Sequence, residues 1–229
     1  MSLYDRDYSK TQELSSRQSS ALSTFIKQTY QLFAASLLAA TAGAYVGIYA
    51  LGGISQMAFW ILFIVEIGLL FGLMAKKREA PLNLILLFAF TFCSGLTLTP
   101  LLSSVLALPA GATIVAQAFA LTTLAFGALS IFAMNTKKDF TTMGKMLFIV
   151  LIVVVCASLF NIFFHSPMLQ LVISSVAAIL FSFYILYDTQ NIIRGNYETP
   201  IEGAVALYLD FVNLFTALLQ ILGLTSSRE

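Results

Sequence analysis

Long apolar segments, separated by short polar or turn-forming stretches, follow one another along most of the chain. A helix needs roughly 20 mostly apolar residues to cross the hydrocarbon core of a bilayer. The segments that reach this length cover residues 26–50, 55–75, 82–106, 112–134, 144–164, 168–191 and 201–223. They do not alternate between apolar and polar positions as barrel strands would. The pattern therefore predicts an all-α polytopic membrane protein with seven transmembrane helices, because helices satisfy their own backbone groups in lipid.

The first part of the chain has a different pattern. Residues 1–24 are polar and carry charges of both signs, with Ser and Gln between them. A segment of this composition cannot bury a hydrophobic core. We therefore expect a disordered cytoplasmic tail over residues 1–24, followed by a single transmembrane domain over residues 25–229.

Apart from Arg228 near the C-terminus, basic residues lie in or next to the N-terminal segment and alternate loops, which sets the orientation in the membrane. They are Arg6, Lys10, Arg17, Lys27, Lys76, Lys77, Arg78, Lys137, Lys138, Lys145 and Arg194. Loops rich in Lys and Arg stay in the cytoplasm. We therefore expect a cytoplasmic N-terminus and, after seven spans, a C-terminus on the far side. If one segment were re-entrant, the C-terminus would return to the inside.

Composition narrows the possible functions. Apolar residues make up 59% and charged residues 10% of the chain, which is too little polar surface for a water-soluble globule. With a net charge of +1 and no basic stripe, nucleic acid is not an expected partner, and the lipid bilayer is. No Gly-rich phosphate loop is present, and the only histidine, His165, has no catalytic or metal-spaced neighbours in sequence. We therefore expect neither an enzyme nor a cofactor.

Three acidic residues stand out inside the predicted helices, namely Glu66, Asp188 and Asp210. Ionisable groups in a membrane are costly and indicate function by default. Asp188 lies about one turn from the cytoplasmic end of its helix, and Asp210 lies roughly 13 Å from the same side at 1.5 Å per residue. Both therefore belong to the cytoplasmic half. Lys77 ends the second segment on that side and shares a helix face with Glu66.

The last predicted helix carries a stripe of small and polar residues at spacings of three and four. The stripe consists of Gly203, Ala206, Asp210, Asn213, Ala217 and Gln220. Small residues let helices approach closely in lipid, and polar ones need protein partners there. We therefore expect this helix at the centre of the bundle, with Asp210 pointing inward. Gly68 and Gly72, four residues apart in the second segment, predict a similar close contact.

Two interpretations of the aspartates stay open from spacing alone. Two carboxylates close together in a low dielectric share a proton, and once ionised they suit a hard cation such as Ca²⁺. With Lys77 stabilising one charge, Asp188 and Asp210 would then form a proton-sensitive gate, and Glu66, Asn213 and Gln220 would line the cation pathway. Alternatively, the aspartates are structural groups satisfied by Tyr, Asn or backbone partners.

At these aspartates the sequence resembles a known family. The segments Phe181–Asp188 and Leu207–Phe215 are similar to the paired signatures of the Bax inhibitor-1 family, the TMBIM superfamily. The stretch Ser94–Pro100 and the triplet Lys137-Lys138-Asp139 agree in order. The similarity covers roughly residues 26–223, and it is greatest to bacterial members.

The resemblance implies a fold and an activity. The fold has seven helices with the last one central. The implied activity is a pH-sensitive Ca²⁺ leak in a bacterial inner membrane, carried out by a monomer with Ca²⁺ and protons as its ligands. Its di-aspartyl gate matches Asp188 and Asp210, and the basic residue that contacts the pair matches Lys77. The family also pairs an acid matching Glu66 with an Arg near the end of the last helix, where this chain has Gln220 and cannot form the ion pair.

A second branch of the same family implies a different function. Its members resemble modulators of a membrane-bound ATP-dependent protease and engage it through a cytoplasmic tail, for which residues 1–24 would serve. A proton-coupled transporter would also need intramembrane acids, but the sequence shows no broken-helix repeats. Deletion of the tail would separate the first two interpretations, since a leak should survive it and protease engagement should not.

Overall fold

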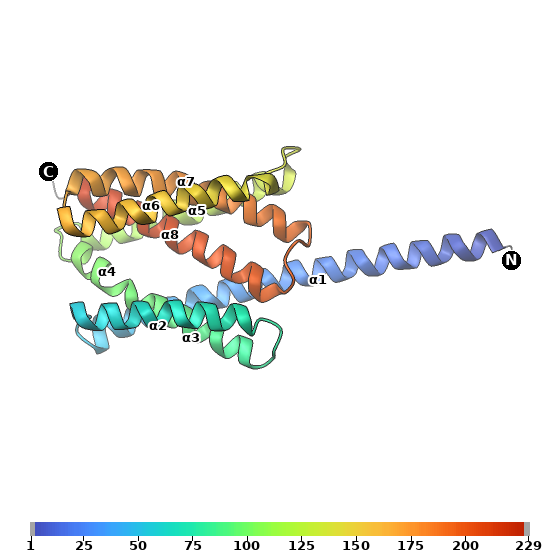
Figure 1. The fold of residues 1–229 in the computed structure, drawn as a ribbon, viewed down its shortest axis with the longest axis horizontal. Coiled ribbons are helices and arrows are strands. Elements are labelled where there is room, and N and C mark those ends of the chain that lie inside the picture. Colours follow the sequence, from blue (N-terminus) through green and yellow to red (C-terminus); the bar gives the residue numbers. More distant parts are fainter. Residues whose placement is uncertain (1–2, 227–229) are drawn as a thin grey trace.

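The computed structural model describes residues 3–226, with side chains from Arg17 onward, and this part is a bundle of helices without strands (Figure 1). The α-helices are α1 (Leu3–Tyr45), α2 (Gln56–Ala75), α3 (Leu82–Thr97), α4 (Thr99–Leu106), α5 (Gly111–Asn135), α6 (Gly144–Phe164), α7 (Pro167–Ile193) and α8 (Pro200–Ser226). Within the described residues, 7 helical segments are long and apolar enough to cross a membrane. The predicted all-α fold with seven spans is therefore confirmed.

The first helix is longer than the apolar pattern predicts. A disordered tail was expected over residues 1–24, whereas α1 is helical from Leu3 and projects well beyond the bundle (Figure 1). Residues 3–24 contain neither Gly nor Pro, the two strongest helix breakers. Once the membrane part of α1 is formed, each added residue extends an existing helix and avoids the cost of a new nucleus.

The third span consists of two helices. α3 ends at Thr97 and α4 begins at Thr99, with Leu98 between them. Pro100 lies in the first turn of α4, where its missing N–H would have no partner in any helix, so this position tolerates proline. The chain therefore bends within the apolar layer and carries α4 away from α3.

The last helix lies at the centre of the bundle, as its stripe predicts. α8 contacts α7, α1, α5, α3 and α4. Both of its faces are covered, because the bulky side opposite the small residues is also in the core, where Tyr208 is fully buried and Phe211 packs edge-on against Phe126. In contrast, α2 and α6 lie at the periphery beside α3 and α7 (Figure 1). Both helices expose most of their apolar side chains.

Glycine-mediated packing occurs at a different place from the one expected. A Cβ atom on Gly68 or Gly72 would meet nothing within 4 Å, so the expectation of a close contact through α2 was wrong. The close approach is between α1 and α3, where a Cβ on Gly43 would overlap the backbone of Phe92 and one on Gly95 would overlap that of Ala40. Both sites join backbone to backbone, which only glycine allows.

Candidate functional site

The site is a pair of buried carboxyl groups between α7 and α8. Asp188 lies near the C-terminal end of α7 and is 5% exposed, and Asp210 lies in the first half of α8 and is 3% exposed. Their carboxyl groups are within hydrogen-bonding reach of each other. Ionised carboxylates only accept hydrogen bonds, so a contact of this kind is favourable when one of the two carries a proton. The structure thus brings together the two aspartates that the sequence singled out.

Asp188 has a further partner that sequence reasoning missed. The Tyr197 hydroxyl, in the connection between α7 and α8, donates a hydrogen bond to Asp188 Oδ1 at 2.5 Å. Burial and the nearby Asp188 raise the pKa of Tyr197 well above its usual value, so this phenol stays a donor. Asp210 Oδ2 is buried and has no donor among the described residues. Asp188 therefore has a hydrogen-bond donor outside the pair, whereas Asp210 Oδ2 has none among the described residues.

The end of α7 turns sharply enough to bring Tyr197 back over the pair. Gly195 has a φ of 69°, a left-handed conformation that glycine adopts without steric cost. Its N–H donates to the carbonyl of Ile192 at 3.1 Å, and the N–H of Asn196 donates to that of Asn191 at 2.9 Å. These two bonds form a Schellman motif, which reverses the chain at a helix C-terminus.

The start of α8 is also held by hydrogen bonds between residues that are close in sequence. Pro200 is the first residue of the helix, where its preset φ favours helix formation. The Glu202 N–H donates to Thr199 Oγ1 at 3.3 Å, and Glu202 Oε2 accepts from the backbone N–H of Glu198 at 3.0 Å. This reciprocal pattern is close to a capping box. The connection of residues 194–199 is therefore defined at both ends by its own sequence.

Lys77 lies on the expected side but does not form the expected contact. Its Nζ pairs with Glu198 Oε2 at 2.9 Å and Glu202 Oε1 at 3.1 Å. The hydrogen bond to Glu198 is the main reason that the pKa of Lys77 is raised, and the same bond lowers the pKa of Glu198. The structure does not bring Lys77 into the direct aspartate contact that the resemblance implies, because its partners are glutamates at the α7–α8 connection.

The three residues proposed for a cation pathway lie in separate environments. Glu66 Oε2 accepts from Thr97 Oγ1 at 2.7 Å, between α2 and α3. The amide of Asn213 donates to the Leu209 carbonyl of its own helix at 2.7 Å. Gln220 accepts from the neighbouring helix α7, and its partners are neutral. The structure does not bring these residues together at one point.

Gln220 belongs to a chain of neutral polar groups at the end of the bundle opposite the aspartates. Its Oε1 accepts from Gln170 Nε2 at 2.8 Å and from Ser174 Oγ at 2.6 Å. Gln170 Oε1 in turn accepts from Asn161 Nδ2 at 2.9 Å, which links α6, α7 and α8. A cavity of about 290 Å³ lies beside Gln170 and Gln220. The network contains no ionisable group, so neutral hydrogen bonds join this end of α8 to α7.

Fold and site together define a polytopic helical membrane protein whose central helix carries half of a buried di-carboxyl pair. The family model described as "Inhibitor of apoptosis-promoting Bax1" matches residues 22–227. The chain therefore belongs to the Bax inhibitor-1 family.

Similarity to individual proteins extends over most of the chain. It is 77% identical to an uncharacterized protein of Campylobacter jejuni over 100% of both chains. An uncharacterized membrane protein of Vibrio cholerae is 38% identical over 89% of this chain and 91% of its own. The Golgi anti-apoptotic protein of vaccinia virus is 36% identical over 71% of this chain and 67% of its own.

Proposed function

We propose that the protein is a pH-sensitive cation leak, with Ca²⁺ as its cargo, and that the Asp188–Asp210 pair is its gate and proton sensor. The observation that carries this proposal is the mutual contact of two carboxyl groups in a buried position between the central helix and α7. In a low dielectric, two such groups cannot both ionise cheaply, so the pair exchanges a proton at a pH set by the surroundings.

A change in proton number alters the contact between α7 and α8. With one proton shared, the two carboxyl groups attract each other; without it, two negative charges repel at close range. The same ionised oxygens bind a hard cation. Two carboxylates supply fewer than the six to eight oxygens that Ca²⁺ takes, so water completes the shell and the ion binds only in transit.

We also propose how the protein is oriented in the membrane. The basic loops after α2, α5 and α7 lie at the end of the bundle from which α1 projects, and these loops favour the cytoplasm (Figure 1). We place this end in the cytoplasm of a bacterium and the chain in the inner membrane. The aspartates then respond to protons that enter from the cytoplasmic side.

The test is a flux assay in liposomes that enclose a Ca²⁺-sensitive dye. The wild-type protein should release Ca²⁺ at a rate that changes with pH, and Asp188→Asn or Asp210→Asn should flatten this pH dependence. Glu79→Gln is the matched control, because Glu79 is an exposed carboxyl group in a loop at the same end of the bundle and pairs with Lys76. Unaltered pH dependence in both pair variants would contradict the gate.

A protein–protein function remains the second candidate, and one observation favours it. The N-terminal part of α1 extends beyond the bundle, where it can meet a partner such as a membrane-bound protease (Figure 1). Removal of residues 1–16 distinguishes the two functions. The leak should keep its rate and pH dependence, because the aspartates are untouched, whereas an interaction function should be lost.

A further inference from the structure

We propose that residues 194–199, here called the strap, close the cytoplasmic side of the aspartate pair, with Tyr197 as the positioning residue and Glu198 as its attachment to the α2–α3 loop. The part of this inference that concerns gating rests on the proposed function. The strap itself is a structural feature that can be tested without any flux measurement.

The strap has little freedom of its own, because the Schellman motif holds one end and the cap of α8 holds the other. A further bond joins the Asn196 side chain to Asn191 Oδ1 at 2.9 Å, next to Tyr197 in the chain. Tyr197 is therefore directed inward by its neighbours on both sides. Its hydroxyl is the only group of the strap that bonds to Asp188 in the described structure.

Glu198 points the other way and fastens the strap to a different part of the molecule. Its Oε2 pairs with Lys77 Nζ at 2.9 Å and with Arg78 Nη2 at 2.9 Å. The Lys77 side chain is 20% exposed and that of Arg78 is 71% exposed, so water screens the Arg78 pair more strongly. Lys77 is thus the principal attachment, and it acts on the aspartates through Glu198 and Tyr197.

The α2–α3 loop is itself positioned for this contact. Asn83 Nδ2, at the start of α3, donates to the backbone carbonyl of Lys77 at 3.0 Å. A cavity of about 790 Å³ borders Lys77, Arg78, Asn83 and Glu198, so there is room for water and small solutes beside the attachment. The attachment can therefore open while the bundle remains folded.

Other titratable groups face the same region. Tyr184 and Tyr187 of α7 lie close enough to Asp188 or Tyr197 to interact electrostatically, and Asp210 approaches from α8. Among these groups, Tyr197 is the one that does not belong to a membrane helix. Movement of the strap consequently changes the hydrogen bonding of Asp188 without moving α7 or α8.

The first variant is Tyr197→Phe, which removes the hydroxyl and keeps the ring. Loss of one hydrogen bond to a charged group changes an equilibrium by about tenfold or more. We therefore expect the basal Ca²⁺ leak to rise by about tenfold and the midpoint of its pH profile to move, together with a small fall in the melting temperature. A merely structural tyrosine would change the melting temperature and leave the pH midpoint in place.

The second variant is Glu198→Gln, which removes the attachment and keeps the side-chain shape. It should also raise the basal leak, and the double variant with Tyr197→Phe should leak no more than the stronger single variant, because both act through one strap. Glu79→Gln is the matched control, since Glu79 pairs with Lys76 in the same loop and does not contact the strap.

Hydrogen exchange of the backbone amides of residues 194–199 tests the strap independently of the proposed Ca²⁺ leak. Glu198→Gln should speed their exchange, and Glu79→Gln should not, whether or not the wild-type protein conducts Ca²⁺. Wild-type exchange in Glu198→Gln, or a wild-type leak and pH midpoint in Tyr197→Phe, would overturn the strap. A wild-type protein that does not leak would overturn the proposed function alone.

Discussion

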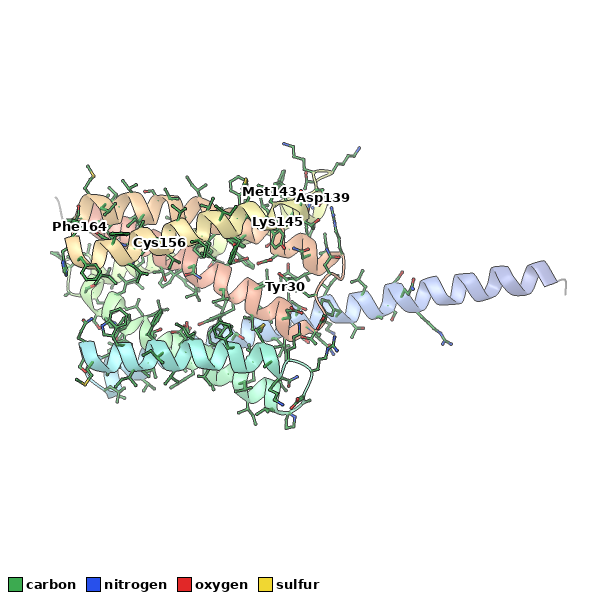
Figure 2. The ribbon with its side chains drawn as sticks, viewed as in Figure 1. Tyr30, Asp139, Met143, Lys145, Cys156 and Phe164 are labelled. Atoms are coloured by element: carbon green, nitrogen blue, oxygen red, sulfur yellow. The ribbon has the colours of Figure 1, made fainter. Side chains whose placement is uncertain are left out.

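At the scale of single residues, ion pairs in the loops at the strap end of the bundle join segments that are distant in sequence. Asp139 lies between α5 and α6 (Figure 2). It pairs with Arg194 of the strap at 2.8 Å and accepts two hydrogen bonds from Thr141. The bond from Arg194, together with those from Thr141, lowers the pKa of Asp139 from 3.8 to about 2. The strap is therefore tied to the α5–α6 loop as well as to the α2–α3 loop.

The lowered pKa gives a prediction for stability at acid pH. The unfolded chain binds a proton to Asp139 at a higher pH than the folded chain does, so the ionised carboxylate stabilises the fold above about pH 4. This contribution is lost as the pH falls through about 2. In detergent, the melting temperature of Asp139→Asn should fall less than that of the wild type between these two values.

Arg194→Gln serves as the companion variant, because it removes the main cause of the shift and leaves the carboxyl group. It should show the same weak acid dependence as Asp139→Asn, and the double variant should add nothing to either. Since both side chains are partly exposed to solvent, the effect should also shrink as salt is added. Parallel curves for wild type and Asp139→Asn throughout the acid range would contradict the assignment.

At the scale of helices, the crossing of α1 and α3 depends on backbone contact. Gly95→Ala would place a methyl group against the backbone of Ala40, where no flexible side chain can give way. Overpacking of this kind typically costs about 1–3 kcal/mol. We expect a lower melting temperature and a smaller free energy of unfolding in mixed micelles. Gly68→Ala is the control on α2, because its added methyl group meets open space.

The outcome at these glycines shows what helical spacing predicts and what it leaves open. Glycines four residues apart line one face, but the same spacing occurs on a face that meets lipid, as at Gly68 and Gly72. The spacing therefore predicts that the glycines share one face of a helix, but not whether another helix packs against that face. Equal stability of Gly95→Ala and Gly68→Ala would mean that α1 and α3 can separate freely, against the packing described above.

The spans and the central helix were predictable because they depend on local properties of the chain. The length of each apolar segment determines where a helix crosses the lipid. The stripe of small and polar residues on α8 indicated that this face packs against other helices of the protein. Asp188 and Asp210 came together for the same reason, since depth along adjacent antiparallel helices follows from residue counting.

The partners of Lys77 and Asp188 were not predictable from the same kind of argument. A lysine side chain is long and flexible, and the sequence does not say which of several nearby carboxylates it reaches. Tyr197 bonds to Asp188 only because Gly195 reverses the chain after α7. The Gly-Asn-Tyr-Glu-Thr-Pro run did carry the signal, in a glycine after one helix and a Thr-Pro cap before the next.

At the scale of the whole molecule, seven spans place the two ends of the described chain at opposite ends of the bundle (Figure 1). The strap, Asp139 and the projecting part of α1 share one end, while Phe164 lies at the other (Figure 2). The compartment that faces the strap is therefore the one whose conditions act on its ion pairs. Orientation decides which pH the protein responds to.

Single-cysteine labelling measures that orientation. In a background of Cys93→Ser and Cys156→Ser, Lys137→Cys reports the strap end and Ala110→Cys the opposite end, since both positions are exposed. With the N-terminus in the cytoplasm, a membrane-impermeant maleimide should label Ala110→Cys on intact cells and Lys137→Cys only after permeabilisation. The reverse result would turn the strap outward, so that external pH and salt, not cytoplasmic ones, would control access to Asp188 and Asp210.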